Sequence, residues 1–444
     1  MVTRLATSIT TVVVLMGSLV ACGETTQSVA FTTEPEPTVE KTSEEAAKPL
    51  AIADQYDKDN SEVLSAVAEI SIILDEGVEP DEFPYRREWM PASIEVFIDS
   101  ILIHEGRAGI HVRGNTSRDF DKKSFALETW DDNDQDHDVA LLGLPAEEDW
   151  ILQGPFSDKS LIRNHLIYTL SRDIGRYAAR TRFVELEVNG DYRGVYVLME
   201  KIKRDDVRVA LPSGAALLKR DWLEDNDAFI QTTACRDDLK VEWNNDIDDV
   251  VSRLDSIEAQ LLAGDFNSLD LKSFVDHMLI VELGRNVDGY VLSTWITLSE
   301  DDILGMGPVW DYNGSLGNAS YFEAWMTEGW HYENPEFPGD NPRGFCWYEA
   351  LLESPSFLEL RRERWQTHRA GAWSDAAIEA RIDEAVAVLQ PAVDKNFERW
   401  PILGEVVWPN DLAAEGRTTF TEEITYLKSW VRQRTAWMDR ALRS

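Results

Sequence analysis

The hydrophobic period of the sequence changes near its middle, and this change limits the folds that the chain can adopt. Between residues 63 and 200, short runs of branched and aromatic residues alternate apolar with polar positions, which is typical of half-buried strands. From residue 273 onward, apolar residues recur every three or four positions, which is the period of an amphipathic helix. The sequence therefore predicts an α+β fold with a sheet-rich first half and a mainly helical second half.

The first half is expected to form an antiparallel sheet with one helix before its last hairpin. The expected strands are Val63–Leu74, Ser93–Ile103, Ala108–Val112 and Lys122–Trp130. A helix is expected within Ser157–Gly175, because Ser157 or Asp158 can cap its start. Two further strands flank Asn189-Gly190, the dipeptide that most strongly indicates a two-residue hairpin turn.

The second half is expected to contain several helices and one short pair of strands. A helix through Ser273–Leu283 precedes two strands that flank the turn Glu300–Asp302. Ser374 and Asp375 can cap a further helix. The last helix carries apolar residues at helical spacing, namely Phe420, Ile424, Leu427, Val431, Met438 and Leu442.

The first residues of the chain predict export. Residues 1–21 contain a positive charge at Arg4, an apolar run from Ile9 to Val20 and small residues before the cleavage point, as a secretory signal peptide does. Cys22 matches the lipobox of bacterial lipoproteins, in which this cysteine carries the acyl chains that hold the protein to a membrane. The apolar run is shorter than the ~20 residues that a membrane-spanning helix needs.

The segment after Cys22 differs in composition from the rest of the chain. Residues 22–50 are rich in Thr, Glu, Pro and Ser, so they are expected to form a disordered tether. Residues 51–444 then form one domain with a sheet-rich lobe (51–205) and a mainly helical lobe (206–444). The order of signal peptide, lipidated Cys22, tether and folded domain predicts a lipid-anchored, extracytoplasmic protein of the cell envelope, at the outer membrane or the cell surface.

The chain of 444 residues is strongly acidic. Its formal net charge of −38 argues against a nucleic-acid backbone or an anionic lipid surface as partner and favours a basic protein. Acidity that serves only solubility is the alternative, and the sequence leaves both open.

Cysteine and acidic residues give few signals of metal binding. Cys235 and Cys346 can pair in an oxidising compartment, but the sequence does not fix the distance between them and leaves the disulfide open. No CxxC motif and no cluster of His and Cys predicts a zinc site. The acidic stretch Asp131–Asp138 lacks the Gly and the final Glu of an EF-hand, so we expect a solvated loop there.

Seven short blocks occur in a characteristic order along the chain. They are RGNTS (113–117), KKSF (122–125), LLGLP (141–145), DKSLIRN (158–164), TRFVELEVNGDYRGVYVLMEKIKRD (181–205), RNVDGY (285–290) and GPVWDYNGSLGNA (307–319). In this order they resemble the spore-coat protein H (CotH) kinase family, from about residue 60 to the end of the chain. The resemblance implies an atypical protein kinase of two lobes that uses ATP and Mg²⁺, with Mn²⁺ as an alternative metal.

Two aspartates stand where the resemblance places the catalytic and the metal-binding carboxylates. Asp288 follows a predicted helix and precedes a short strand, and Asp311 ends the second strand and enters a Gly-rich loop. The resemblance assigns Asp288 to the acceptor hydroxyl and Asp311 to the metal. The alternative is that both are ordinary turn-forming aspartates.

The second metal ligand departs from the pattern of typical kinases. Five residues after Asp288, where a typical kinase has Asn, this chain has Ser293, whose hydroxyl is a poorer metal ligand. Asn313, two residues after Asp311, is a substitute candidate.

Residues on the nucleotide side are also assigned by the resemblance. Lys123 is expected to reach the phosphates, with Arg113 as a second candidate and a surface lysine as the alternative reading of Lys123. Glu200 and Lys201 fall at the expected hinge, where the backbone would contact adenine and the side chains would serve the ribose or remain in solvent. The helix that carries the Glu partner of the lysine in typical kinases has Arg163 and Asn164 here.

The sequence thus leaves a ranked set of functions. The first is an exported, Mg²⁺-dependent kinase that transfers the γ-phosphate of ATP to Ser or Thr of a secreted or surface protein. The second is a catalytically weak or inactive relative that serves as a surface-displayed binding or adhesion protein. A lipoprotein hydrolase is the third, but the chain has no G-x-S-x-G motif.

Overall fold

The computed structural model describes residues 66–75, 88–223, 227–244, 246–334, 336–337 and 342–443, all within one unit, Lys48–Ser444. The predicted signal peptide, Cys22 and the predicted tether lie outside these residues. No helix within the described ranges is long and apolar enough to cross a bilayer.

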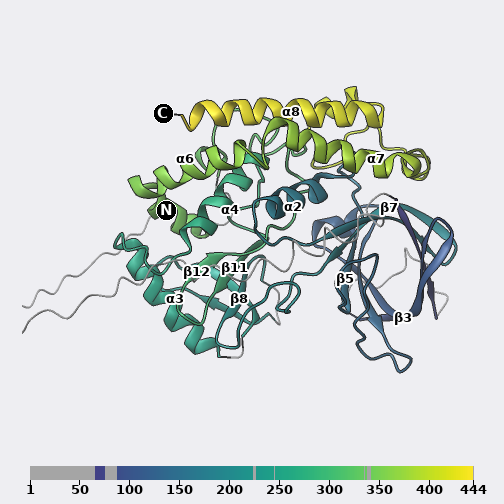
Figure 1. Cartoon of the computed structure of the whole chain (residues 1–444), viewed down its shortest axis with the longest axis horizontal. Coiled ribbons are helices and arrows are strands. Elements are labelled where there is room, and N and C mark those ends of the chain that lie inside the picture. The colour runs from purple at the N-terminus through teal and green to yellow at the C-terminus, as the bar shows by residue number, and fades with distance from the viewer. Residues whose placement is uncertain are drawn as a thin grey trace, which may run out of the picture. The chain divides into compact units, whose positions relative to one another are not determined.

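Seven strands of the first half close into a barrel (Figure 1). In spatial order they are β1 (Ala68–Leu74), β2 (Met90–Ile98), β3 (Ile101–Arg113), β4 (Ser124–Trp130), β5 (Asp149–Gln153), β7 (Asp191–Glu200) and β6 (Thr181–Val188). Neighbours are antiparallel except β1 and β6, which run parallel from Ala68 opposite Val184 to Ile72 opposite Val188. The expectation of a purely antiparallel sheet is therefore wrong, because the apolar pattern identifies strands but not the strands that they meet.

Of two hairpin turns in the barrel, the sequence predicted one and not the other. The turn at Asn189-Gly190 is confirmed, with both residues at positive φ between β6 and β7. The expected strand Ser93–Ile103 is wrong, because Asp99 and Ser100 adopt φ of 50° and 63° and turn the chain from β2 into β3. Neither residue is the glycine that usually marks such a turn.

The helix expected before the last hairpin is present as α2 (Arg163–Asp173). Asp158 supports its start, because Oδ2 accepts a hydrogen bond from the Arg163 N–H at 2.8 Å. The helix begins five residues after Asp158, later than its predicted cap implies. Strand β5, which the sequence did not indicate, precedes this segment.

Strand β7 has no solvent face over most of its length, because its two faces pack against different cores. Tyr196 and Leu198 point into the barrel core, whereas Val195, Val197 and Met199 belong to the larger core of the helical part. Side chains alternate along a strand, so one strand can serve both cores. Helix α7 (Asp375–Arg399) packs against β7 (Figure 1).

The second half contains a sheet as well as helices. Its five strands lie in the order β12 (Leu304–Met306), β11 (Thr294–Leu298), β8 (Ala216–Arg220), β10 (Asp238–Trp243) and β9 (Phe229–Gln231). The expected pair around residues 300–302 is confirmed as β11 and β12. Strands β8 to β10 were not predicted, so the expectation of a mainly helical second half is incomplete.

The predicted helices of the second half are present, and α3 (Ile247–Leu262), which lies before residue 273, was not predicted. The others are α4 (Leu271–Gly284), α5 (Cys346–Leu352), α6 (Pro355–Arg369), α7 and α8 (Phe420–Ala441), with short 3₁₀ turns at Thr116–Asp119, His331–Glu333, Pro342–Phe345 and Leu412–Gly416. The predicted cap of α7 is confirmed, since Ser374 Oγ accepts a hydrogen bond from the Ala377 N–H at 3.2 Å. The six apolar residues predicted for the last helix are all buried.

The disulfide that the sequence left open is present. Cys235 and Cys346 are bonded, with their Cα atoms 5.7 Å apart. The bridge joins the segment between β9 and β10 to the first residue of α5, across 111 residues of sequence.

Candidate active site

Asp288 lies in the turn that connects α4 to β11. The helix ends at Gly284, and Arg285 adopts a left-handed conformation with φ of 44° that redirects the chain. The Asp288 carbonyl then accepts hydrogen bonds from the N–H groups of Val291 and Leu292, both at 2.8 Å. These backbone bonds hold the turn, and in the described residues no hydrogen bond to the Asp288 carboxyl group contributes to it.

Asp311 follows β12 and is held by α2. Its φ of 61° is in the left-handed region, which is uncommon for a residue other than glycine and needs support from its surroundings. The Asp311 N–H donates to the Tyr168 hydroxyl at 3.1 Å, and the next N–H, of Tyr312, donates to Asn164 Oδ1 at 2.7 Å. Buried side chains of α2 therefore set the direction of Asp311.

The loop after Asp311 is held by the same helix. The buried Arg163 guanidinium donates from Nε to the Ser315 carbonyl at 3.0 Å and pairs with Asp158. Arg163 and Asn164 stand where typical kinases carry a glutamate on this helix, and here they position the loop that carries Asp311. This positioning role of Arg163 and Asn164 could not be predicted from the sequence.

One buried amide connects the two aspartates. Asn286 Oδ1 accepts a hydrogen bond from the Asp288 N–H at 3.2 Å, and its Nδ2 donates to the Asp311 carbonyl at 3.1 Å. Asn286 is 1% exposed, so these bonds do not compete with water. The two turns, 23 residues apart in sequence, are thereby brought to one place.

The negative charge of Asp311 acts on the carboxyl group of Asp288, and that of Asp221 acts on both. Desolvation, followed by the negative charges of Asp311 and Asp221, raises the pKa of Asp288 to about 7. Desolvation also raises the pKa of Asp311, while the positive charge of Arg113 acts in the opposite direction. The surrounding protein atoms desolvate both groups although part of each side chain remains accessible.

A third carboxylate, Asp221, faces the same place and was not predicted. It follows β8, and its charge raises the pKa of both Asp288 and Asp311. Its Oδ1 accepts a hydrogen bond from the Trp222 N–H at 2.9 Å, and Lys219 forms an ion pair with it. The only signal that could have revealed it was the end of β8, a strand that the apolar pattern did not show.

Arg113 is the basic residue that the barrel contributes to this site. It is the last residue of β3, and its guanidinium carbon lies 5.7 Å from the centre of the Trp310 ring, next to Asp311. Desolvation lowers the pKa of Arg113, and the charges of Asp311 and Asp221 oppose that shift. The predicted residue Arg113 and the predicted residue Asp311 are therefore brought together.

The two lysines before β4 make other contacts. Lys123 Nζ donates to the Arg118 carbonyl at 2.7 Å, and Lys122 Nζ donates to Asn396 Oδ1 on α7 at 2.9 Å. Lys122 is 1% exposed, and its contact with α7 joins the barrel to the helical part. Neither contact lies at the two aspartates, so a phosphate role of Lys123 stays a prediction.

The side chains of Glu200 and Lys201, which were expected at the hinge, form ion pairs with other residues of the chain. The Glu200 carboxylate is fully buried, forms an ion pair with Arg180 at 2.7 Å and accepts from the Tyr177 hydroxyl at 3.1 Å. The alternative of a Glu200 side chain in solvent is therefore wrong. Lys201 Nζ, half exposed, lies 2.8 Å from Asp149 Oδ1. An adenine contact through this backbone stays a prediction.

Three acidic residues at the start of β5 form a separate cluster. The carboxylates of Glu147, Glu148 and Asp149 lie close enough together for one cation, but Lys203 Nζ lies 2.5, 2.7 and 2.9 Å from them. Burial raises the pKa of Glu147 to about 7, and Lys203 opposes this shift. Arg208 also pairs with Glu147, and Lys201 pairs with Asp149, so three cations of the chain already compensate the charge of this cluster.

The remaining predicted metal candidates lie beside the two aspartates in sequence. Ser293 precedes β11 in a left-handed conformation with φ of 50°, and the Asn313 carbonyl accepts a hydrogen bond from Asn318 Nδ2 at 2.7 Å. In the described part of the chain, neither side chain hydrogen-bonds to Asp288 or Asp311. Their role as metal ligands stays a prediction.

Three carboxyl groups from separate turns, Asp221, Asp288 and Asp311, and the Arg113 guanidinium therefore lie near enough for their charges to act within one desolvated place. Such hard oxygen donors fit Mg²⁺ or Mn²⁺, and the guanidinium fits a phosphate. The sequence model of the family described as "CotH kinase protein" matches residues 110–438, which include all of these groups. No curated protein matches the chain. Because the matched region covers most of its residues, the chain belongs to the CotH kinase family.

Proposed function

We propose that this chain is an exported, Mg²⁺-dependent phosphotransferase that moves the γ-phosphoryl group of ATP to a Ser or Thr hydroxyl of a basic secreted or surface protein. The observation that carries the proposal is that Asn286 joins the desolvated turns of Asp288 and Asp311, where the charges of Asp311 and Asp221 act on Asp288 and that of Arg113 acts on Asp311. Membership of the CotH kinase family supports the same chemistry. Clusters of perturbed carboxyl groups are typical of catalytic sites.

Asp311 and Asp221 are the proposed ligands of the metal ion. Both offer carboxylate oxygens, which Mg²⁺ and Mn²⁺ prefer, and Asp221 supplies the strong second ligand that Ser293 lacks. Ser293 and Asn313 remain candidates for further ligands of the same metal ion. When bound, a divalent metal with ATP would supply the transferable phosphoryl group and reduce the negative charge around these carboxylates.

Asp288 is the proposed proton acceptor. In the transfer, the acceptor hydroxyl oxygen forms a bond to the γ-phosphorus, the bond from that phosphorus to the β-bridging oxygen breaks, ADP leaves, and the hydroxyl proton passes to Asp288. A pKa of about 7 suits this task, because a base with a pKa near the working pH is both deprotonated and sufficiently basic. The proton then returns to solvent.

Arg113 is the proposed phosphate-binding residue of the barrel, with Lys123 as the second candidate. A guanidinium can donate two parallel hydrogen bonds to phosphate oxygens, and Arg113 already lies beside Asp311. The backbone at Glu200 and Lys201 is the proposed adenine contact. The signal peptide, the lipid anchor on Cys22 and the tether are part of the same proposal, since they place the domain where it meets exported proteins.

A phosphotransfer assay tests this function. Purified protein is incubated with γ-labelled ATP, MgCl₂ and a basic protein such as histone, beside the variants Asp311→Asn and Asp288→Asn. We expect labelling by the unchanged protein and a loss of at least ~100-fold in both variants. Asp301→Asn, an exposed change on the turn between β11 and β12, is the matched control.

The opposite result has a defined meaning. If the unchanged protein labels neither histone nor itself with Mg²⁺ or Mn²⁺, the catalytic proposal fails. A surface-displayed binding protein is then the better account of the chain.

A further inference from the structure

A cavity lies beside the loop that follows Asp311. Its volume is about 430 Å³, and its walls come from residues 325–328, residues 411–413 and helix α8. Its lining includes the aromatic residues Trp325, Tyr426 and Trp430 and the acidic residues Glu328 and Asp411. It is separate from the three carboxylates of the candidate active site, and nothing in the proposed transfer uses it.

The two segments that meet at this cavity carry negative charge only. Residues 312–330 and 401–416 contain no Lys or Arg, but they contain five acidic residues. These are Glu323, Glu328, Glu405, Asp411 and Glu415. Helix α8 compensates part of this charge, because Arg440 forms an ion pair with Glu328 at 3.1 Å, whereas among the described residues the nearest cation to Asp411 is Arg417 at 4.0 Å. The Asp411 carboxylate is thus the group that attracts a further cation, and cations also bind favourably over the faces of Trp and Tyr rings.

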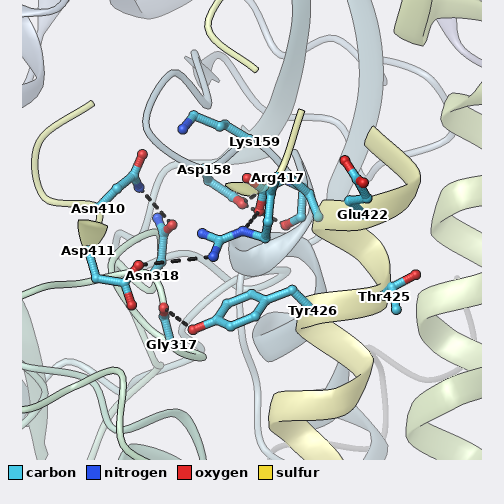
Figure 2. A network of polar contacts seen from close by, with 12 residues as sticks. Asp158, Lys159, Gly317, Asn318, Asn410, Asp411, Arg417, Glu422, Thr425 and Tyr426 are labelled. Carbon is cyan, nitrogen blue, oxygen red and sulfur yellow. Dashed lines mark hydrogen bonds and ion pairs between the residues drawn. The ribbon is translucent and has the colours of Figure 1, made fainter. Parts of the chain in front are cut away.

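The Asp411 carboxylate has unused hydrogen-bonding capacity. Its Oδ1 is buried and receives no hydrogen bond from the described part of the chain. Arg417 Nη1 lies 4.0 Å from it, which is too far for a hydrogen bond (Figure 2). Arg417 is already engaged, because its Nε donates to Glu423 at 2.9 Å and its guanidinium lies 4.1 Å from the centre of the Tyr426 ring. A buried carboxylate oxygen without a hydrogen bond is energetically costly, so binding of a further hydrogen-bond donor to it is favourable.

The cavity lies near the acceptor side of the active site. The charges of Asp288 and Asp311 both act on the Tyr321 phenol. The Tyr321 ring stacks on Trp408, with centres 6.1 Å apart and planes 6° from parallel. Trp408 is 55% exposed and stands three residues before Asp411. This stacked pair therefore joins the segment that follows Asp311 to the segment that carries Asp411.

Hydrogen bonds hold these two segments in a fixed relation. The Ser320 N–H donates to the Pro409 carbonyl at 2.7 Å. Asn410 Nδ2 donates to Asn318 Oδ1 at 2.9 Å, and the Tyr426 hydroxyl donates to the Gly317 carbonyl at 2.8 Å (Figure 2). The cavity wall and the loop after Asp311 are thus parts of one preorganised surface.

We infer that this cavity is an arginine-binding subsite for the polypeptide whose hydroxyl is presented to Asp288. The guanidinium would pair with Asp411 and lie against Trp325, while the chain crosses Trp408 and Tyr321. Arginine is preferred over lysine, because its planar group pairs with a carboxylate through two hydrogen bonds and stacks on an aromatic ring. This inference rests on the proposed function only for the presence of an acceptor polypeptide.

Peptide binding tests the subsite without any phosphotransfer. The probes are a fluorescein-labelled (Gly-Ser-Arg)₄ amide and the same peptide with citrulline, which keeps the shape of arginine but is neutral. The Kd values are measured by anisotropy at low ionic strength in the absence of nucleotide. We expect the arginine peptide to bind at least ~10-fold more tightly than the citrulline peptide.

Matched variants separate a built subsite from general acidity. Asp411→Asn and Glu415→Gln each remove one negative charge from the same segment, but only Asp411 lines the cavity. We expect Asp411→Asn to weaken the arginine peptide by roughly 10-fold and Glu415→Gln to change it less than ~2-fold. Trp325→Leu, which leaves every charge in place, is expected to weaken it by roughly 3-fold or more. Melting temperatures confirm that the variants fold.

Two results overturn the inference. One is equal binding of the arginine and citrulline peptides, and the other is an equal effect of Asp411→Asn and Glu415→Gln. Either result contradicts an arginine-binding subsite in this cavity, even if histone is phosphorylated in the separate assay. The expected binding pattern supports the subsite even if no phosphate is transferred, so its failure and the failure of the proposed function remain distinguishable.

Discussion

Asp288 and Asp311 are joined through the side chain of one residue, the buried Asn286, which bonds to the backbone of both. This amide leaves the two carboxyl groups free of the bonds that hold their turns. Each carboxyl can therefore act on an external group, and the negative charge of Asp311 raises the cost of ionising Asp288. The proposed catalytic chemistry depends on this arrangement.

The first prediction concerns the pH dependence of phosphotransfer. A base with a pKa of about 7 loses its function as the pH falls, so kcat/KM for ATP with Mg²⁺ should decline about tenfold per pH unit below that value. This decline is the acidic limb of the pH profile. Removing the negative charge of Asp221 lowers the pKa of Asp288. In Asp221→Asn, the acidic limb should therefore begin at a lower pH than in the unchanged protein.

The comparison between the two proteins is the decisive part of that measurement, because titration of ATP itself is common to both. Asp301→Asn should leave the limb unmoved. A limb that stays in place or moves to higher pH in Asp221→Asn contradicts the placement of Asp221 beside Asp288.

The second prediction concerns stability. The pKa of Asp288 is higher in the folded chain than in the unfolded chain, so the unfolded state loses its proton first as the pH rises from about 4 to 7. Folding is therefore progressively disfavoured through this window, and the loss is complete above about pH 7. Asp288→Asn removes this cost and should raise the melting temperature by roughly 2–6 °C at pH 8.

The pH series gives the control for this effect. At about pH 4 the carboxyl is protonated in the folded protein, so the advantage of the variant should largely disappear. An advantage of equal size at pH 4 and pH 8 contradicts the account of a desolvated, charge-strained carboxyl.

The sequence predicted the parts of this site that depend on local pattern. Asp288 and Asp311 follow a helix and a short strand, so their turns could be located from the apolar periodicity and the family resemblance. Asp221 could not be found, because β8 is short and carries Lys219 and Arg220 within an otherwise apolar run. Asn286 could not be identified either, since its role requires two turns to meet in space.

The fold was predictable to a similar extent. Alternation and the Asn189-Gly190 turn located most strands of the first half, but barrel closure depends on the parallel contact between β1 and β6. The residues of these two strands lie more than 100 positions apart, and no local pattern encodes that pairing. The turn at Asp99-Ser100 was missed because its residues usually avoid positive φ.

The third prediction concerns the cation on the nucleotide side. Arg113 lies beside Asp311, whereas Lys123 bonds to the Arg118 carbonyl. Arg113→Met should weaken binding of ATP with Mg²⁺ by roughly 10-fold or more, and Lys123→Met should weaken it less than ~3-fold. Thermal shift at several ATP concentrations measures both affinities. A larger effect of Lys123→Met contradicts the assignment of Arg113.

The fourth prediction concerns the disulfide. Cys235 and Cys346 close a segment of 111 residues, which restricts the unfolded chain. The double variant Cys235→Ser, Cys346→Ser should lose about 2–4 kcal/mol in its free energy of unfolding, measured by urea denaturation. A reducing agent should destabilise the unchanged protein by a similar amount and leave the double variant unaffected. Equal sensitivity of the two proteins to reduction contradicts a structural role of the bridge.

The central claim is that Asp311 and its neighbours bind ATP through a divalent metal, and calorimetric titration tests it most directly. ATP is titrated into the unchanged protein, Asp311→Asn and Asp301→Asn, each with MgCl₂ and with EDTA. We predict binding to the unchanged protein and Asp301→Asn that requires Mg²⁺, and a loss of at least ~30-fold in affinity in Asp311→Asn. Equal affinity of Asp311→Asn and the unchanged protein, or binding that is unaffected by EDTA, contradicts the claim.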